Sequence, residues 1–161
     1  MAGPLVNPGD FLVFSTAGWE AHVIQVATRS RWNHAAVYIG DGWIIEANPA
    51  GVQRSRLSKY DGRPMLCSDL QLNSMVARTV VGRAEGQLGL PYGWLDVAAI
   101  GLSTVGIVLP KLDDPDTRFC SQVVALALAG AGVSLTTKAP NRVTPGDLGR
   151  IILGQPVPAN W

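Results

Sequence analysis

The sequence predicts an α+β fold in which a small antiparallel sheet packs against helices, including a buried helix that carries a cysteine. Two runs rich in β-branched and aromatic residues flank Gly40-Asp41-Gly42, which is the pattern of a hairpin. Residues 120–129 are apolar around almost the whole circumference of a helix, which indicates an internal helix. The chain has 161 residues, enough for one core, and we assign residues 1–161 to a single domain.

The composition argues against several classes of protein. Hydrophobic residues make up 47% of the chain and charged residues 16%, and the formal net charge is +1. These values are typical of a globular protein. Basic residues occur at most as scattered pairs, so we expect no nucleic acid partner. The first ten residues lack the charged and apolar segments of a secretory signal, which predicts a cytoplasmic protein or one carried in a phage particle.

The chain contains two cysteines, Cys67 and Cys120, and two histidines, His22 and His34. They do not show the CxxC or HxxxH spacing of a metal site, so we expect no metal and no cofactor. The sequence alone does not decide whether the two cysteines form a disulfide. Cys67 lies in a short apolar run and is interpreted as structural. His22 falls within a predicted helix and is interpreted as a surface histidine.

Short-range signals predict the remaining elements. Strands are expected at Phe11–Phe14 and Met65–Cys67, with a polar extended run at 51–59. Helices are expected at 18–28, at 75–88 with Ser74 as cap, from about 94 to 101, and from Pro145 with Thr144 as cap. The inner side of the second of these helices is predicted to be Met75, Val76, Val80, Ala84 and Leu88. The cysteine-bearing helix is expected to be capped by the acidic and threonine residues at 113–117 and to end at Gly130 and Gly132.

The register of the hairpin decides which of its side chains are neighbours. A three-residue loop sets Ala36 opposite Glu46, and His34 then lies near Glu46 on the same face. A two-residue Asp-Gly loop would place His34 and Glu46 on opposite faces. We favour the three-residue loop because both strands then turn their apolar sides to one core. The expected polar face holds His34, Ala36, Tyr38, Ile44, Glu46 and Asn48, and the expected core face holds Ala35, Val37, Ile39, Trp43, Ile45 and Ala47.

Three side chains have the chemistry of a nucleophilic site. A thiol near a helix N-terminus, such as that of Cys120, is placed where the reactive thiolate is favoured. A carboxylate beside an imidazole, as predicted for Glu46 and His34, fixes its tautomer and raises its basicity. The alternatives are that Cys120 is a small buried hydrophobe and that His34 and Glu46 form a solvated surface pair.

Six segments occur in an order that carries further information. They are residues 8–14 (PGDFLVF), 32–40 (WNHAAVYIG), 45–47 with 51–52 (IEA and GV), 89–94 (GLPYGW), 119–124 (FCSQVV) and 144–148 (TPGDL). This order resembles the circularly permuted branch of the NlpC/P60 papain-like cysteine hydrolases, the YiiX/YebB-like group. The resemblance covers nearly the whole chain and implies a permuted papain-like fold. It also implies Cys120 as nucleophile, His34 as base and Glu46 as the residue that orients His34.

The resemblance also suggests residues around the nucleophile. Tyr92 is a candidate donor to the carbonyl oxygen, and Ser121 and Asn48 are candidates for positioning the substrate. The chain departs from the family pattern in three places. Gln122 stands where an acidic residue is frequent, Gly93 stands where Asp is frequent, and an insertion at 102–117 separates Tyr92 from Cys120. These departures leave the substrate and the role of Tyr92 open.

The wider family suggests that the substrate is a peptide amide, above all one in the stem peptides of peptidoglycan, with phage virion or tail proteins as possible partners. A lipid or acyl-thioester hydrolase or acyltransferase is the alternative. It would need the apolar run at 97–109 to line a pocket, whereas our interpretation of that run is a buried helix, too short to span a membrane. A third possibility is a virion or structural protein that keeps the fold and does little chemistry.

Overall fold

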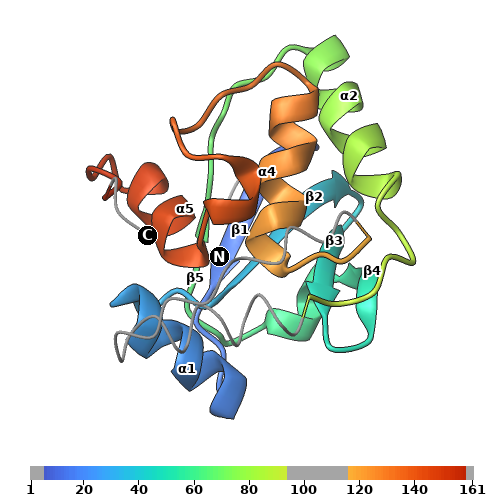
Figure 1. Ribbon diagram of the computed structural model, residues 1–161. Coiled ribbons are helices and arrows are strands. Elements are labelled where there is room, and N and C mark those ends of the chain that lie inside the picture. The colour runs from blue at the N-terminus through green and yellow to red at the C-terminus, as the bar shows by residue number, and fades with distance from the viewer. Residues whose placement is uncertain (1–5, 94–115, 159–161) are drawn as a thin grey trace.

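The computed structural model describes residues 6–93 and 116–158, and it is an antiparallel sheet with helices on one face and at one end (Figure 1). The sheet order is β4-β3-β2-β1-β5, and every pair of neighbours is antiparallel. The strands are β1 (Phe11–Phe14), β2 (His34–Gly40), β3 (Trp43–Asn48), β4 (Gly51–Arg56) and β5 (Met65–Cys67). The described helices are α1 (Trp19–Thr28), α2 (Ser74–Glu85), α4 (Cys120–Gly130) and α5 (Pro145–Ile152), with 3-10 turns η1 (Leu57–Tyr60) and η2 (Pro140–Arg142).

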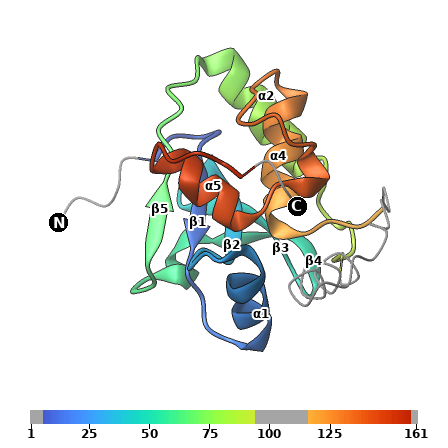
Figure 2. The ribbon, with the colours of Figure 1, turned by 60° about the vertical axis from the view of Figure 1, so that its left-hand side comes forward.

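Both faces of the sheet are covered, but by different kinds of structure. Helices α2, α4 and α5 lie over one face, and the main core forms between them and the odd-numbered residues of β1, β2 and β3, such as Val13, Val37 and Ile45. The other face carries a smaller cluster that includes Phe14 and is closed by η1 and its flanks. Helix α1 connects the end of β1 to the start of β2 and lies beyond that end of the sheet (Figures 1 and 2).

The hairpin has the predicted register at Glu46 but reaches it by a different turn. Ala36 pairs with Glu46, as expected. The loop, however, has two residues, Asp41 and Gly42, which both adopt positive φ (51° and 73°), and the prediction of a three-residue loop was wrong. A bulge between Tyr38 and Gly40 inserts the extra residue. It shifts the register by one and so restores the pairing that a two-residue loop alone would have lost.

The bulge also changes the environment of Trp43. This residue was expected on the core face, yet it is only half-buried and lies outside the main core. The guanidinium groups of Arg56 and Arg54 stack on its indole ring, 3.8 and 4.7 Å from the centroid. Trp43 therefore lies at the turn end of β3. There the long side chains of two arginines from β4, and not a helix, cover the indole ring.

Helix α2 differs from its predicted bounds and inner side. Its cap is Asn73, whose side chain accepts hydrogen bonds from the backbone N–H groups of Met75 and Val76, so the assignment of Ser74 was wrong. The buried residues of the helix are Val80 and Ala84. Val76, Val80 and Ala84 form the stripe that faces the core. Each residue along a helix turns the side chain by about 100°, so Met75, one residue before Val76, points away from this stripe and is 72% exposed. Leu88 is 43% exposed because the helix ends at Glu85 and does not carry Leu88 onto the same face.

The helices near the C-terminus follow the prediction more closely. Helix α4 is buried along most of its length and ends at Gly130, and α5 begins at Pro145 with Thr144 as its cap. The expected cap of α4 was wrong. The helix starts directly at Cys120, so Phe119 is at the cap position, and the Gln122 side chain accepts from the Phe119 backbone N–H (3.4 Å). In the described parts of the chain no helix is long and apolar enough to cross a bilayer. The segments predicted at 94–101 and 97–109 lie outside the described residues.

Candidate active site

His34 and Glu46 are joined by a hydrogen bond at one end of the sheet. His34 is the first residue of β2, and Glu46 lies in the adjacent strand β3. The Nε2 atom of His34 is 2.7 Å from Oε2 of Glu46. The carboxylate is completely buried and the imidazole is 13% exposed. The two side chains therefore form a desolvated pair and not the solvated pair that was the alternative.

Cys120 is the second partner of the same imidazole. Its thiol interacts with His34 through hydrogen bonding and charge, which raise the pKa of the imidazole, although the two residues come from distant parts of the sequence. Because Nε2 faces Glu46, the Nδ1 atom is the nitrogen left to face the thiol. Cys120 is 3% exposed, and both cysteines are free thiols, so the possibility of a disulfide is excluded. The packing of α4 on the sheet thus brings together the three predicted residues.

The carboxylate of Glu46 accepts four hydrogen bonds. Oε2 accepts from His34 and from the hydroxyl of Tyr60. Oε1 accepts from the hydroxyl of Ser55 at 2.6 Å and from the ammonium of Lys59 at 2.8 Å. Four donors use about the full acceptor capacity of an ionised carboxylate. Burial by itself would raise the pKa of Glu46, but the bond and charge of His34 and the bonds from Lys59 and Ser55 outweigh it and hold the pKa far below its usual range.

Sequence reasoning missed three of these four donors. Ser55 lies on β4, and a register for the β3–β4 hairpin would have placed it on the face of Glu46, two residues from the partner Gln53. Lys59 and Tyr60 were assigned to an extended run or left without a role. They reach Glu46 because the chain tightens into the turn η1 after β4, and no periodicity in the sequence indicates this turn.

The same contacts raise the basicity of His34. Burial lowers the pKa of the imidazole and is the largest single influence, but hydrogen bonds to Cys120 and Glu46 and the negative charges of both partners act in the opposite direction. The net result is a pKa raised from 6.5 to about 9. Burial, together with the charge and hydrogen bond of Glu46, also raises the pKa of Tyr60 far above its ordinary value. At neutral pH the imidazole is therefore charged and Tyr60 donates its proton.

A groove of about 220 Å³ opens beside His34. It lies between α1, the loop after β1, the turn between β3 and β4, and Tyr92. Its described lining contains no charged side chain except His34. The lining residues are Thr16, Ala17, Ala21, Ile24, Asn33, His34, Ala47, Asn48, Pro49, Tyr60 and Tyr92. The groove thus gives a neutral, partly apolar substrate access to the imidazole.

The three predicted accessory residues have different surroundings. Asn48 and Tyr92 line the groove. Oδ1 of Asn48 accepts from the Ala50 backbone, and its Nδ2 has no protein partner within residues 6–93 and 116–158. Ser121 is fully buried, and its hydroxyl donates to the carbonyl of Val143 at 2.7 Å. Its side chain fastens α4 to the segment before α5, and Ser121 is not among the residues that line the groove.

The other thiol and the other imidazole lie elsewhere. Cys67 is on β5, which β1 separates from the strand of His34, and burial with the nearby charge of Asp10 raises the pKa of its thiol. His22 is exposed on α1. In residues 6–93 and 116–158 no three His, Cys, Asp or Glu side chains are placed to hold one metal ion.

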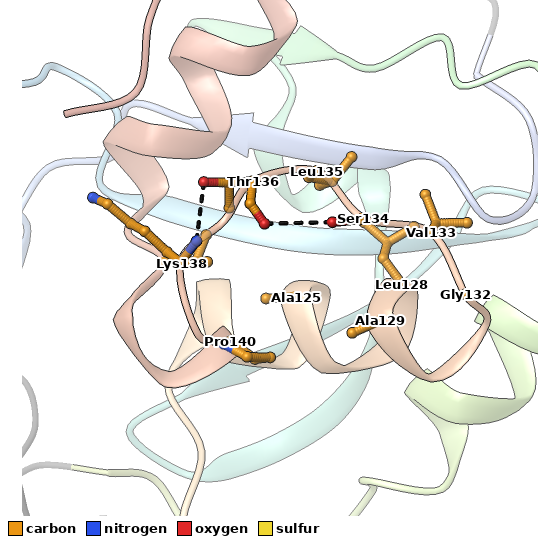
Figure 3. A pocket seen from close by; sticks show the side chains of 11 residues that line it. Ala125, Leu128, Ala129, Gly132, Val133, Ser134, Leu135, Thr136, Lys138 and Pro140 are labelled. Atoms are coloured by element: carbon orange, nitrogen blue, oxygen red, sulfur yellow. Dashed lines mark hydrogen bonds between the residues drawn. The ribbon is translucent and has the colours of Figure 1, made fainter. Parts of the chain in front are cut away.

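A second pocket, of about 260 Å³, lies between the last turns of α4 and the loop that follows it (Figure 3). Its walls are mainly aliphatic, and the hydroxyl of Ser134 is bonded to the carbonyl of Thr136. Lys138 is its one ionisable residue among those described, and the ammonium is paired with Asp147 at 2.9 Å. The pocket is similar in size to the groove beside His34, but no thiol or imidazole lines it, so we place the candidate active site at His34.

Comparisons with known proteins agree with this fold. The chain is 24% identical over 182 residues to the probable lipoprotein peptidase YaeF of Escherichia coli strain K12; the alignment covers 96% of this chain and 66% of that protein. The crystal structure of the metalloprotein yiiX of Escherichia coli O157:H7 superposes with a TM-score of 0.65 at 18% identity, over 81% of this chain and 69% of yiiX. No protein-family model matches the sequence. The chain is therefore similar in sequence to a probable lipoprotein peptidase and shares the fold of yiiX.

Proposed function

We propose that this protein is a cysteine hydrolase of amide bonds, with Cys120 as nucleophile, His34 as general base and acid, and Glu46 as the residue that orients His34. One observation carries the proposal: a single imidazole is hydrogen-bonded to a buried carboxylate and interacts with the thiol of Cys120. The similarity to the peptidase YaeF supports a hydrolase. The ordered motifs further support assignment to the permuted NlpC/P60 group.

The geometry suggests how the reaction would proceed. His34 holds the proton of Cys120 at Nδ1 in a thiolate–imidazolium pair, and the thiolate attacks the substrate carbonyl carbon. The charge that develops on the carbonyl oxygen is stabilised by the backbone N–H of Cys120 at the start of α4, with Tyr92 as a second candidate donor. The imidazolium then protonates the leaving amine. Water, deprotonated by His34, hydrolyses the thioester. Glu46 keeps the Nε2 proton in place throughout.

The groove indicates what kind of substrate segment would lie next to His34. Its described lining is neutral apart from His34, so it favours small or apolar substrate groups over charged ones. The free amide N–H₂ of Asn48 is available to donate to a substrate carbonyl. A peptide amide fits these requirements, and stem peptides of peptidoglycan are the substrate we propose to test first.

An acyl ester or thioester is the second candidate substrate. The apolar surface contributed by Ala21, Ile24 and Pro49 to the groove favours it, because an acyl chain would bury these groups. A parallel assay with a short peptide amide and a medium-chain acyl thioester separates the two. A thioester is intrinsically more reactive than an amide, so the ratio of the two enzymatic rates is compared with the ratio of the rates with a small thiol. A larger enzymatic ratio would favour the acyl substrate.

The experiment that tests the proposal compares the two cysteines. Cys120→Ala should abolish the release of new amine ends from a digest of wall peptides, whereas Cys67→Ala should retain it, because only Cys120 is bonded to His34. Alkylation with iodoacetamide near neutral pH should label Cys120 faster than Cys67. Equal loss of activity in both variants would contradict the assignment. So would labelling of Cys120 that is no faster than that of Cys67.

A further inference from the structure

We propose that Lys59 and Tyr60 are positioning residues that set the orientation and charge of His34 through Glu46, an inference that rests on the proposed function. Both residues bind the carboxylate that binds the imidazole. They are consecutive in the chain and lie at the end of η1. A single turn therefore supplies two donors to one buried carboxylate.

The two residues bind different oxygens of Glu46. Tyr60 donates to Oε2, the oxygen that also accepts from His34. Lys59 donates to Oε1, together with Ser55. Donors on both oxygens prevent the carboxylate from rotating about its terminal bond. As a result, Oε2 stays directed at Nε2 of His34 and Nδ1 stays directed at the thiol.

Tyr60 also holds the imidazole by direct packing. Its ring stacks on Phe14 with centroids 4.1 Å apart, and it lies 5.6 Å from the ring of His34. Phe14 is itself 5.9 Å from His34. The imidazole thus packs against two aromatic rings, one of which is bonded to its carboxylate partner. Tyr60→Phe keeps this packing and removes only the hydroxyl, so it isolates the hydrogen bond.

Lys59 acts through its charge. Within residues 6–93 and 116–158, the ionisable groups that face Glu46 or its partner His34 are Lys59 and Tyr60 from η1 and Cys120 from α4. When Cys120 is a thiolate and His34 an imidazolium, Glu46 and Lys59 form a second pair of opposite charge. Removing the ammonium leaves the carboxylate charge without compensation, which favours the protonated imidazole. Lys59 is 48% exposed, so solvent reduces this effect without cancelling it.

The test is a titration of His34 by NMR in the intact protein. Replacing His22 with Gln leaves His34 as the single imidazole. In that background, Lys59→Met should move the midpoint of the His34 titration upward by about 0.5 to 1 pH unit. Tyr60→Phe should move it upward by a smaller amount, because the carboxylate loses a donor and binds the His34 proton more strongly. Lys59→Arg should restore the midpoint of the parent.

Tyr38→Phe is the matched control. Tyr38 lies on the same face of the sheet, but its hydroxyl accepts from the backbone N–H of Gly42 and not from Glu46. It should leave the midpoint unchanged. Midpoints of Lys59→Met and Tyr60→Phe that equal the parent's in folded protein, as judged by circular dichroism, would overturn the proposal and leave the two residues a structural role.

A kinetic measurement separates this inference from the proposed function. Tyr60→Phe should lower kcat by about tenfold with little change in KM, since the ring that lines the groove is retained. If the parent and Cys120→Ala were equally inactive on every substrate, the proposed function would fail while the His34 titration still decided the roles of Lys59 and Tyr60. If KM rose and kcat did not change, Tyr60 would be a groove residue and not a positioning one.

Discussion

Glu46 and Asp147 are both buried carboxylates bonded to a lysine, but their surroundings differ. Lys59 is 2.8 Å from Glu46 and half exposed, whereas Lys138 is 2.9 Å from Asp147 and only 7% exposed. Asp147 also accepts from the backbone N–H of Thr144, and its own N–H donates to the Thr144 hydroxyl; both of these local bonds cap α5. Glu46 instead binds side chains from other elements, including His34.

The comparison shows that a buried charge does not by itself identify a functional site. Within the described residues, the Asp147 carboxylate binds Lys138 and the backbone N–H of Thr144, which hold a loop to a helix, and neither partner is a thiol or an imidazole. Glu46 accepts four hydrogen bonds, and one of its partners is a titratable ring that interacts with a thiol and lines an open groove. The distinguishing feature is therefore the chain of contacts from carboxylate to imidazole to thiol, which continues to solvent. The following predictions test this difference, from the largest effect to the smallest.

Replacing the carboxylates should separate activity from structure. Glu46→Gln should lower kcat/KM for hydrolysis by about ten- to a thousandfold, because His34 loses the partner that orients it. Asp147→Asn should lower the melting temperature and leave kcat/KM of the folded fraction within about twofold of the parent. The measurement is steady-state hydrolysis beside thermal unfolding. Similar losses of activity in both variants would show that the two carboxylates are not functionally distinct.

Replacing the lysines should cost more stability at Asp147 than at Glu46. Lys138→Met leaves Asp147 buried without its counter-ion and should cost about 3 kcal/mol of unfolding free energy. Lys59→Met removes a half-exposed ammonium and should cost about 1 kcal/mol or less, since three other donors remain on Glu46. Urea unfolding at neutral pH measures both values. A larger cost for Lys59→Met would mean that the Glu46 cluster is mainly a stabilising device.

The His34–Glu46 pair should make stability depend on pH in a defined direction. His34 has a pKa raised from 6.5 to about 9, so its contribution is complete below about pH 6.5 and is lost as the pH rises through about 9. Glu46 has a depressed pKa, so its contribution is complete above about pH 4.5 and is lost in acid. The loss on the alkaline side should reach at most about 3 kcal/mol.

Urea unfolding of the parent and of His34→Gln between pH 6 and 10 measures the alkaline loss. In His34→Gln, most of the fall in unfolding free energy between pH 6.5 and 9 should be absent. Lys138→Met, as the control from the other cluster, should be less stable at every pH with an unchanged slope. A parent whose stability is constant through pH 9 would contradict the charged state assigned to His34.

Besides abolishing hydrolysis, removal of the thiol should cause the smallest of these measured changes, a shift in the titration of one group. In Cys120→Ala the imidazole loses a hydrogen bond and a negative charge, both of which raise its pKa, while its burial remains. The midpoint of the His34 titration should fall by about 1 pH unit. NMR in the background without His22 measures it, and Cys67→Ala should show no shift. An unchanged midpoint in Cys120→Ala would indicate that Glu46 alone sets the protonation of His34.

Much of this architecture could be predicted from short-range patterns. Alternation located the strands at Phe11–Phe14 and around Gly40, and the apolar circumference of α4 indicated its burial. Propensity could not resolve the bulge next to Gly40, because a bulge depends on how two strands close a turn and leaves little trace in either strand. The face of Glu46 was therefore predicted correctly from the wrong loop.

The sequence alone determined which groups with useful chemistry exist: two thiols, two imidazoles and a hairpin that sets an imidazole beside a carboxylate. It could not decide which thiol meets which imidazole, because that contact joins residues 34 and 120 and depends on how α4 packs on the sheet. Nor could it reveal Lys59 and Tyr60, whose donors reach Glu46 only after the chain tightens into η1. Local propensity acts over a few residues, whereas these contacts form only when the core buries distant segments together.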